Sequence, residues 1–271
     1  MPCMRIVTAM LSLVIVVGVC APADALPAYS RLYKGKYGYR VPCELCHTSG
    51  GGSAVNDYGR DFLRAGANLP AFGKIETKDS DEDGANNLAE TTARANPGDP
   101  RSTAAKAGDW LANAGKADVP TEDLKKLFPS ADAFAALEGT LKPAQISTIE
   151  KTIGAKLLDE DRLPTFYFAI KGGKRYALAQ YVSIRADGGL VTLAVAMDTT
   201  GIVSGVKILK NPASKAIEDS AFLTQFRGKK RDDPLVVGKD VVAADKAEAL
   251  SKQVALAVHK AIATINAVFA K

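Results

Sequence analysis

The chain has 271 residues, of which 47% are hydrophobic and 24% are charged, and its formal net charge is +5. These proportions exclude a disordered or collagen-like chain and indicate one large or two modest globular domains. Basic residues exceed acidic ones only after residue 100.

The first element in chain order is a predicted secretion signal. Arg5 precedes an apolar run over 6–19, and the small residues Ala23 and Ala25 follow it. This pattern predicts cleavage after Ala25, because a run of this length is shorter than the roughly 18 to 20 residues that span a bilayer. A retained anchor is the alternative. We expect an exported protein, most simply periplasmic, with no stable membrane anchor after cleavage and no nucleic-acid partner.

The next feature is Cys43-Glu-Leu-Cys46-His47, a C-x-x-C-H motif. Its spacing lets two thiols bond covalently to the two vinyl groups of one haem while the histidine reaches the iron. Signal cleavage would leave these as the only cysteines, which argues against a disulfide framework. A thioredoxin-like pair and a zinc site are the alternatives.

The residues around this motif resemble small single-haem c-type cytochrome domains over about residues 28–66. In that family the motif is followed by a segment similar to Val55-Asn-Asp-Tyr-Gly-Arg-Asp-Phe62. Tyr29, Tyr33, Tyr37 and Tyr39 precede the motif, and we expect their rings to pack on the macrocycle.

The distal ligand of the iron is not evident, because no Met or His occurs from Thr48 through Ala196. The candidates are Met197 or His259 from the second domain, an unusual ligand such as a Lys, Tyr or Asn side chain, or an open iron. For Met197 core packing is the alternative interpretation, and for His259 it is a partly exposed surface position.

A calcium-binding loop follows the haem motif. Residues 79–90 match D-x-D-x-D-G with an acidic residue at position twelve, and the pattern is similar to dockerin and thrombospondin-type loops. A solvated acidic loop is the alternative. Outside the cytoplasm such a site would stay occupied and act as a structural staple. The expected ligands are Asp79, Asp81, Asp83, the Ala85 carbonyl, Asn87 and Glu90.

The second half of the chain predicts an α+β domain after a linker over 101–120. Four β-prone runs separated by glycine turns predict an antiparallel meander. A long helix over 243–269 carries an apolar stripe that should pack on the sheet. The predicted strands are 166–170, 176–184, 190–197 and 202–209, and the other predicted helices are 121–128, capped by Thr121, 143–155 and 214–226.

From about Leu124 the chain resembles the FMN-binding domain of flavin-bearing respiratory subunits. The resemblance lies in the segment Asp198–Ile208 and in Phe222-Leu-Thr-Gln-Phe-Arg-Gly228. In that family a threonine before the last helix carries FMN, but this chain has Lys246 there, which cannot form the phosphoester. The resemblance therefore implies either non-covalent FMN, with its phosphate near Lys246 or the basic clusters 171–175 and 227–231, or a docking domain without flavin.

Together these features predict a multidomain chain. It would consist of a signal peptide at 1–25, a small mainly α cytochrome c-like domain at 26–100, the linker, and an α+β domain at 121–271. The expected function is electron transfer with one covalent haem c, structural calcium and FMN as a candidate cofactor, serving a redox partner protein such as a respiratory complex. The alternatives are an open-iron haem enzyme or ligand sensor, and a calcium-stapled docking subunit without flavin.

Overall fold

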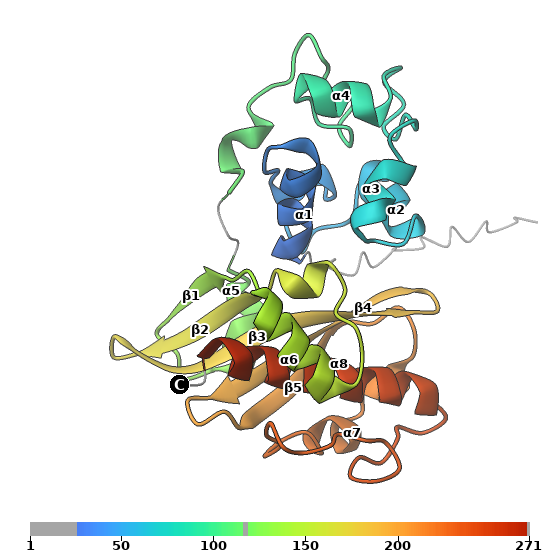
Figure 1. Cartoon of the computed structure of the whole chain (residues 1–271). Coiled ribbons are helices and arrows are strands. Elements are labelled where there is room, and N and C mark those ends of the chain that lie inside the picture. The colour runs from blue at the N-terminus through green and yellow to red at the C-terminus, as the bar shows by residue number, and fades with distance from the viewer. Residues whose placement is uncertain (1–25, 116–118, 270–271) are drawn as a thin grey trace, which may run out of the picture.

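The computed structural model describes residues 26–115 and 119–269, so the predicted signal sequence lies outside the described residues. Within these ranges the chain forms eight α-helices and one five-stranded antiparallel sheet, which makes the fold α+β (Figure 1). Within these ranges, none of the helices combines the length and the apolarity that crossing a bilayer demands.

Residues 26–115 form a helical part of the molecule (Figure 1). Three of its helices begin at an asparagine whose side chain accepts a hydrogen bond from a backbone N–H in the first turn, as N-cap residues do. Its core is aromatic and includes Tyr33, Tyr58, Phe62 and Phe72. The elements are α1 (Pro27–Tyr37), α2 (Asp57–Arg64), α3 (Leu69–Lys74), α4 (Asn87–Ala93) and 3₁₀ helices at Cys43–Leu45 and Trp110–Asn113.

The sheet is a meander in which each strand pairs with the next along the chain. Glycines with positive φ make two of its two-residue turns: Gly172 with Gly173, and Gly188 after Asp187. The predicted meander is confirmed, with one further strand at its start. The strands are β1 (Ala133–Glu138), β2 (Thr165–Lys171), β3 (Lys174–Ala186), β4 (Gly189–Asp198) and β5 (Val203–Lys210).

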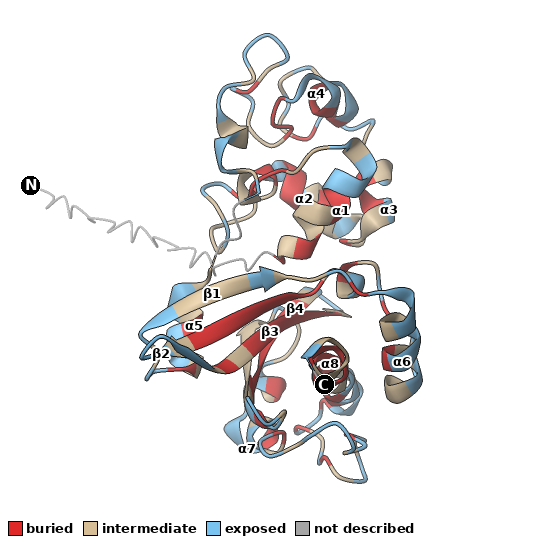
Figure 2. Cartoon of the chain, turned by 60° about the vertical axis from the view of Figure 1, so that its left-hand side comes forward, coloured by how far each residue is buried: buried red, intermediate tan, exposed pale blue. Residues whose placement is uncertain are grey.

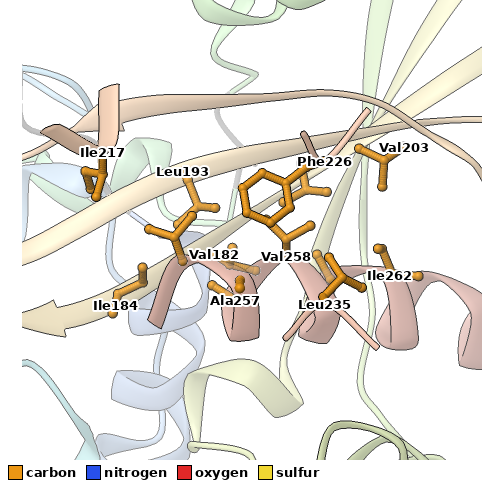
Figure 3. Close-up of a cluster of buried hydrophobic side chains, with 14 of the residues drawn as sticks. Val182, Ile184, Leu193, Val203, Ile217, Phe226, Leu235, Ala257, Val258 and Ile262 are labelled. Carbon is orange, nitrogen blue, oxygen red and sulfur yellow. The ribbon is translucent and has the colours of Figure 1, made fainter. Parts of the chain in front are cut away.

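One face of the sheet packs against α8 (Glu248–Phe269), as its apolar stripe predicts. Figure 3 shows strand residues such as Val182 and Leu193 next to Ala257 and Val258 of the helix. The remaining helices are α5 (Thr121–Leu127), α6 (Pro143–Ile153), which packs beside α8, and α7 (Ser220–Thr224).

The helical part lies on the opposite face of the sheet from α8 (Figure 2). Three arginines join the two parts. Arg31 donates to the Thr140 hydroxyl, at 2.8 Å, and Arg40 makes a bidentate pair with Glu138 of β1, at 2.6 and 2.9 Å. Arg185 of β3 donates to the carbonyls of residues 66 and 67, at 3.0 and 2.6 Å. These contacts hold the sheet against the helical part, so that one face of the sheet lies opposite the haem motif.

Two predicted helices differ from the structure. The helix expected over 214–226 is divided into a 3₁₀ turn at Lys215–Glu218 and α7, because Asp219 is extended, with ψ of 129°, and its carboxylate caps α7. The last helix begins at Glu248 rather than Ala243, because Lys246 has a φ of 53°. The predicted cap at Thr121 is also wrong, since Pro120 holds the N-cap position.

Candidate functional site

The haem motif forms a single tight turn. The backbone N–H groups of Cys46 and His47 both donate to the Cys43 carbonyl, at 3.1 and 3.0 Å. Pro42 enters the turn in an extended conformation, and neither cysteine is in a disulfide. The turn therefore presents two thiols and one imidazole from five consecutive residues.

His47 is 5% exposed, and its ring is oriented by one hydrogen bond. Its Nδ1 lies 2.8 Å from the Ser53 carbonyl oxygen. A carbonyl only accepts, so Nδ1 carries the proton and Nε2 keeps its lone pair. Burial, with a further contribution from the positive charge of Lys210, lowers the pKa of His47, which keeps the ring neutral. A neutral, oriented imidazole is the form that binds a metal.

The Cys46 thiol does not resemble a reactive cysteine. Burial raises the pKa of the Cys46 thiol to about 12, whereas reactive cysteines have lowered values. A zinc site is not supported either. Within the ranges the structure describes, the only group of three or more His, Cys, Asp or Glu ligand atoms close enough to hold a metal is Asp79, Asp81 and Asp83. The ligand atoms of Cys43, Cys46 and His47 therefore do not form such a group.

An apolar crevice of about 90 Å³ lies next to the motif, between the helical part and the sheet. A cavity of about 790 Å³ lies beside the crevice, since Cys43, Pro42 and Val41 line both. The crevice alone is too small for a haem, but the neighbouring cavity is in the range of cofactor sites. The crevice walls include Tyr29, Leu45, Phe62, Leu63 and Phe72 from the helical part and Leu190, Thr192 and Lys210 from the strands.

Gly59 lets α2 approach the motif closely. A Cβ at this position would overlap the Cys46 carbonyl oxygen, so only glycine allows the contact. Gly59 and Phe62 both line the crevice. The segment that carries the cytochrome resemblance therefore forms one wall beside the cysteines.

Of the four tyrosines before the motif, only Tyr29 lines the crevice. The others point toward α3 and α4. Tyr33 donates to the Thr91 hydroxyl at 3.0 Å, Tyr39 to the Thr91 carbonyl at 2.8 Å, and Tyr37 to Glu76 at 2.9 Å. These three tyrosines thus lie away from the crevice, and their phenols connect elements within the helical part.

The predicted calcium loop brings its acidic side chains together. Ligand atoms of Asp79, Asp81 and Asp83 lie within 4.8 Å of one another. Gly84, with a φ of 97°, makes the sharp turn, and its N–H donates to Asp79 at 2.9 Å. The Asp81 carboxylate is buried without a hydrogen-bond partner.

Glu90 is the strongest indication that a cation fits this loop. It is fully buried, and neither carboxylate oxygen has a hydrogen-bond partner. Burial, and then the negative charges of Asp81, Asp83 and Asp79, raise its pKa to about 8. A buried carboxylate beside three others is costly unless a cation compensates it. The donor set is all oxygen, which suits calcium.

Asn87 contributes differently from the expectation. Its side-chain oxygen accepts from the Ser80 N–H at 3.2 Å, and its amide donates to the Ile75 carbonyl at 2.7 Å. These bonds direct the side chain into the loop scaffold, so the structure gives Asn87 a positioning role. For Ala85 the structure shows the N–H donating to Asp83, at 2.8 Å.

The segment after the calcium loop is hydrogen-bonded to the haem motif. Asn96 is buried, and its amide donates to the Glu44 carbonyl at 3.2 Å. Asn56, the N-cap of α2, donates to the same carbonyl at 3.1 Å. Gly98 lies so close to Asn56 that a Cβ would overlap its amide. Hydrogen bonds and close packing thus connect the segment after the calcium loop, α2 and the turn at residues 43–47.

The structure does not bring the other predicted residues to the motif. Met197 is fully buried in the core under α8, and His259 lies on α8 itself. Both are therefore on the opposite face of the sheet from the crevice. Lys246 is exposed and lines neither the crevice nor the cavity beside Cys43.

Two groupings were missed by the sequence analysis. Lys210, at the end of β5, lines the same crevice as His47. A separate cavity of about 460 Å³ is lined by Lys126, Lys207 and Arg227, so it would suit a phosphate better than the surroundings of Lys246 do. Of these, only Arg227 belongs to a basic cluster recognised in the sequence.

Comparison with known proteins supplies no family for this chain. Neither the protein-family models nor the curated proteins give a match. The function is therefore inferred from the haem motif, the crevice and the acidic loop.

Proposed function

We propose that this chain is an exported electron-transfer protein that carries one covalent c-type haem, with calcium as a structural staple. The observation that carries the proposal is the orientation of His47. Its Nδ1 is held by the Ser53 carbonyl, which leaves Nε2 as a ligand. The same turn carries two cysteines and borders an apolar crevice. We also propose that residues 26–100 and 121–271 are separate domains joined by the linker 101–120, since most of each core comes from its own side of the linker.

In this proposal Cys43 and Cys46 form the thioether bonds and His47 is the proximal ligand. The haem supplies reversible one-electron chemistry, and the protein supplies orientation, an apolar environment and exclusion of water. The edge of the haem at Cys43 would border the larger cavity, which Arg40 and Glu44 also line. A redox partner protein would exchange electrons there.

The test is the mass of the mature protein produced in cells with haem-attachment machinery. We expect a covalent haem that remains after denaturation, one calcium that is lost with a chelator, and an N-terminus at Leu26. The matched control is the double variant C43S/C46S, which should keep calcium and lose covalent haem. Wild-type protein without haem under conditions that load a known c-type cytochrome would refute the proposal.

The same sample tests whether the protein binds FMN. FMN that copurifies or binds would extend the proposal to a haem–flavin relay. We then expect Lys207→Ala to weaken FMN more than Lys246→Ala does, because only Lys207 lines a cavity together with two other basic side chains, Lys126 and Arg227. Absence of flavin would leave the sheet-bearing domain with a docking role.

An open-iron enzyme or ligand sensor is the second candidate function. The observation that favours it is that Met197 and His259 lie on the opposite face of the sheet from the crevice. They are the only Met and the second His among the described residues. Carbon monoxide binding to the reduced holoprotein without displacement of a ligand would support it.

A further inference from the structure

The distal side of the proposed haem faces the sheet. His47 enters the crevice from the helical part, whereas Leu190, Thr192 and Lys210 enter it from β4 and β5. Among these strand residues, lysine alone carries a side chain able to donate a nitrogen lone pair to iron. A planar group bound to His47 would have this strand wall on its other side.

The register of the strands fixes the direction of Lys210. Lys210 pairs with Thr192, and directly paired residues project to the same face of a sheet. Thr192 lines the crevice, while its neighbours Val191 and Leu193 pack under α8. An irregularity in the pairing between residues 192 and 193 separates Lys210 from Ile208, which packs against the α8 core. The bulge therefore turns Lys210 toward His47.

We propose that Lys210 is the distal axial ligand of the haem iron, opposite His47. The inference rests on the proposed function. The bond forms when the neutral amine donates its lone pair to iron, and the proton of the former ammonium passes to solvent. Lysine suits this role because its amine is a compact donor on a flexible stem, whereas arginine stays protonated. The site would then be six-coordinate and would carry electrons rather than bind small ligands.

The experiment compares holoproteins loaded with haem by the attachment machinery. The variants are Lys210→Ala and Lys210→Arg, and the matched control is Lys215→Ala, an exposed lysine outside the crevice. Haem content is measured first, and the ferric spin state is then read by electron paramagnetic resonance and optical spectra. We expect a low-spin wild type and control, and loss of the low-spin signal in both Lys210 variants. The reduced Lys210 variants should bind carbon monoxide without displacing a ligand.

Two outcomes would overturn the inference while leaving the proposed function intact. One is a wild-type haem that is high-spin, which would mean an open iron. The other is a fully loaded Lys210→Ala protein that remains low-spin. That result would assign the ligand elsewhere, for instance to the α-amino group that cleavage after Ala25 would create at Leu26, which also lines the crevice.

A wild-type measurement keeps the inference testable even where the variants fail to fold. Near-infrared magnetic circular dichroism of the ferric wild type distinguishes histidine–amine ligation from histidine–methionine and histidine–water ligation. A histidine–amine spectrum in protein whose N-terminal α-amino group has been blocked supports Lys210, and a histidine–methionine or histidine–water spectrum refutes it. Absence of haem from the wild type is a different result, which would refute the proposed function itself.

Discussion

Replacing Arg185 with methionine tests how firmly the two parts of the molecule are joined. Arg185 donates to the carbonyls of residues 66 and 67 in the helical part and also pairs with Glu160 at 2.5 Å. The Glu160 side chain is 2% exposed and that of Arg185 is 31% exposed. Methionine fills similar space but leaves a buried carboxylate without its cation and two carbonyls without a donor.

The expected loss of stability follows from this burial. Breaking a buried ion pair costs about 3 to 5 kcal/mol. Because Arg185 is partly exposed, we expect the lower end, about 3 kcal/mol at neutral pH. Arg162→Met is the matched control, since Arg162 pairs with Asp159 at 3.7 Å and both side chains are more than a third exposed. Exposed pairs contribute about 0 to 1 kcal/mol, so the control should change little.

The loss should also depend on pH. Burial raises the pKa of Glu160 above its ordinary 4.5, and the charge of Arg185 opposes that shift. Without Arg185 the folded-state pKa rises further, so the folded protein binds a proton more tightly than the unfolded chain does. The loss of stability caused by Arg185→Met is therefore small near pH 4.5, and it grows as the pH rises through the folded-state pKa of Glu160.

The assay is urea unfolding followed by far-ultraviolet circular dichroism, which reports mainly on the larger sheet-bearing part, and by fluorescence of Trp110, which lies in the helical part. The variant Glu160→Gln and the double variant complete a cycle, and we expect the arginine to contribute less in the glutamine background. A cost for Arg185→Met no greater than that of Arg162→Met, or one independent of pH, would refute this account of the junction.

Three further predictions concern the helical part. Adding calcium to the metal-free protein should raise the melting temperature, and Glu90→Gln should greatly reduce that rise; equal rises in both would contradict the assignment of Glu90. Gly59→Ala should sharply reduce the yield of haem-loaded protein, because the added Cβ displaces the Cys46 carbonyl, while Gly35→Ala, where no atom lies within 4 Å, should not. Asn96→Ala should cost about 1 to 2 kcal/mol in urea unfolding through its lost bond to Glu44; an unchanged midpoint would show that the bond is not structural.

The sequence was most informative where local chemistry decides the structure. The four predicted strands and the acidic loop were recognised because alternation, glycine turns and the D-x-D-x-D-G spacing act over a few residues. β1 was missed because its sequence, Ala-Phe-Ala-Ala-Leu-Glu, is rich in helix-forming residues. It becomes a strand through pairing with β2, a contact that local propensity does not encode.

The distal wall of the crevice could not be predicted in the same way. Lys210 lies 163 positions after His47 in the chain, and it reaches the crevice only because the helical part rests on one face of the sheet. Met197 is on the same sheet, yet its register places it on the other face. A difference of one position along a strand therefore decides which side chain faces the proposed haem, and only the tertiary structure fixes that register.

The connections around Glu44 suggest why a calcium loop and a haem motif occur in the same small domain. The Glu44 carbonyl accepts from Asn56 and Asn96, so one peptide of the haem turn is held from two sides. Asn96 follows α4, which carries Glu90. The Glu90 carboxylate has no hydrogen-bond partner, so its buried negative charge needs a bound cation to compensate it. Calcium would therefore stabilise the turn that positions His47 without touching it. In the proposed haem protein, a turn held in this way would change little when the iron changes charge, and a small structural change favours rapid electron transfer.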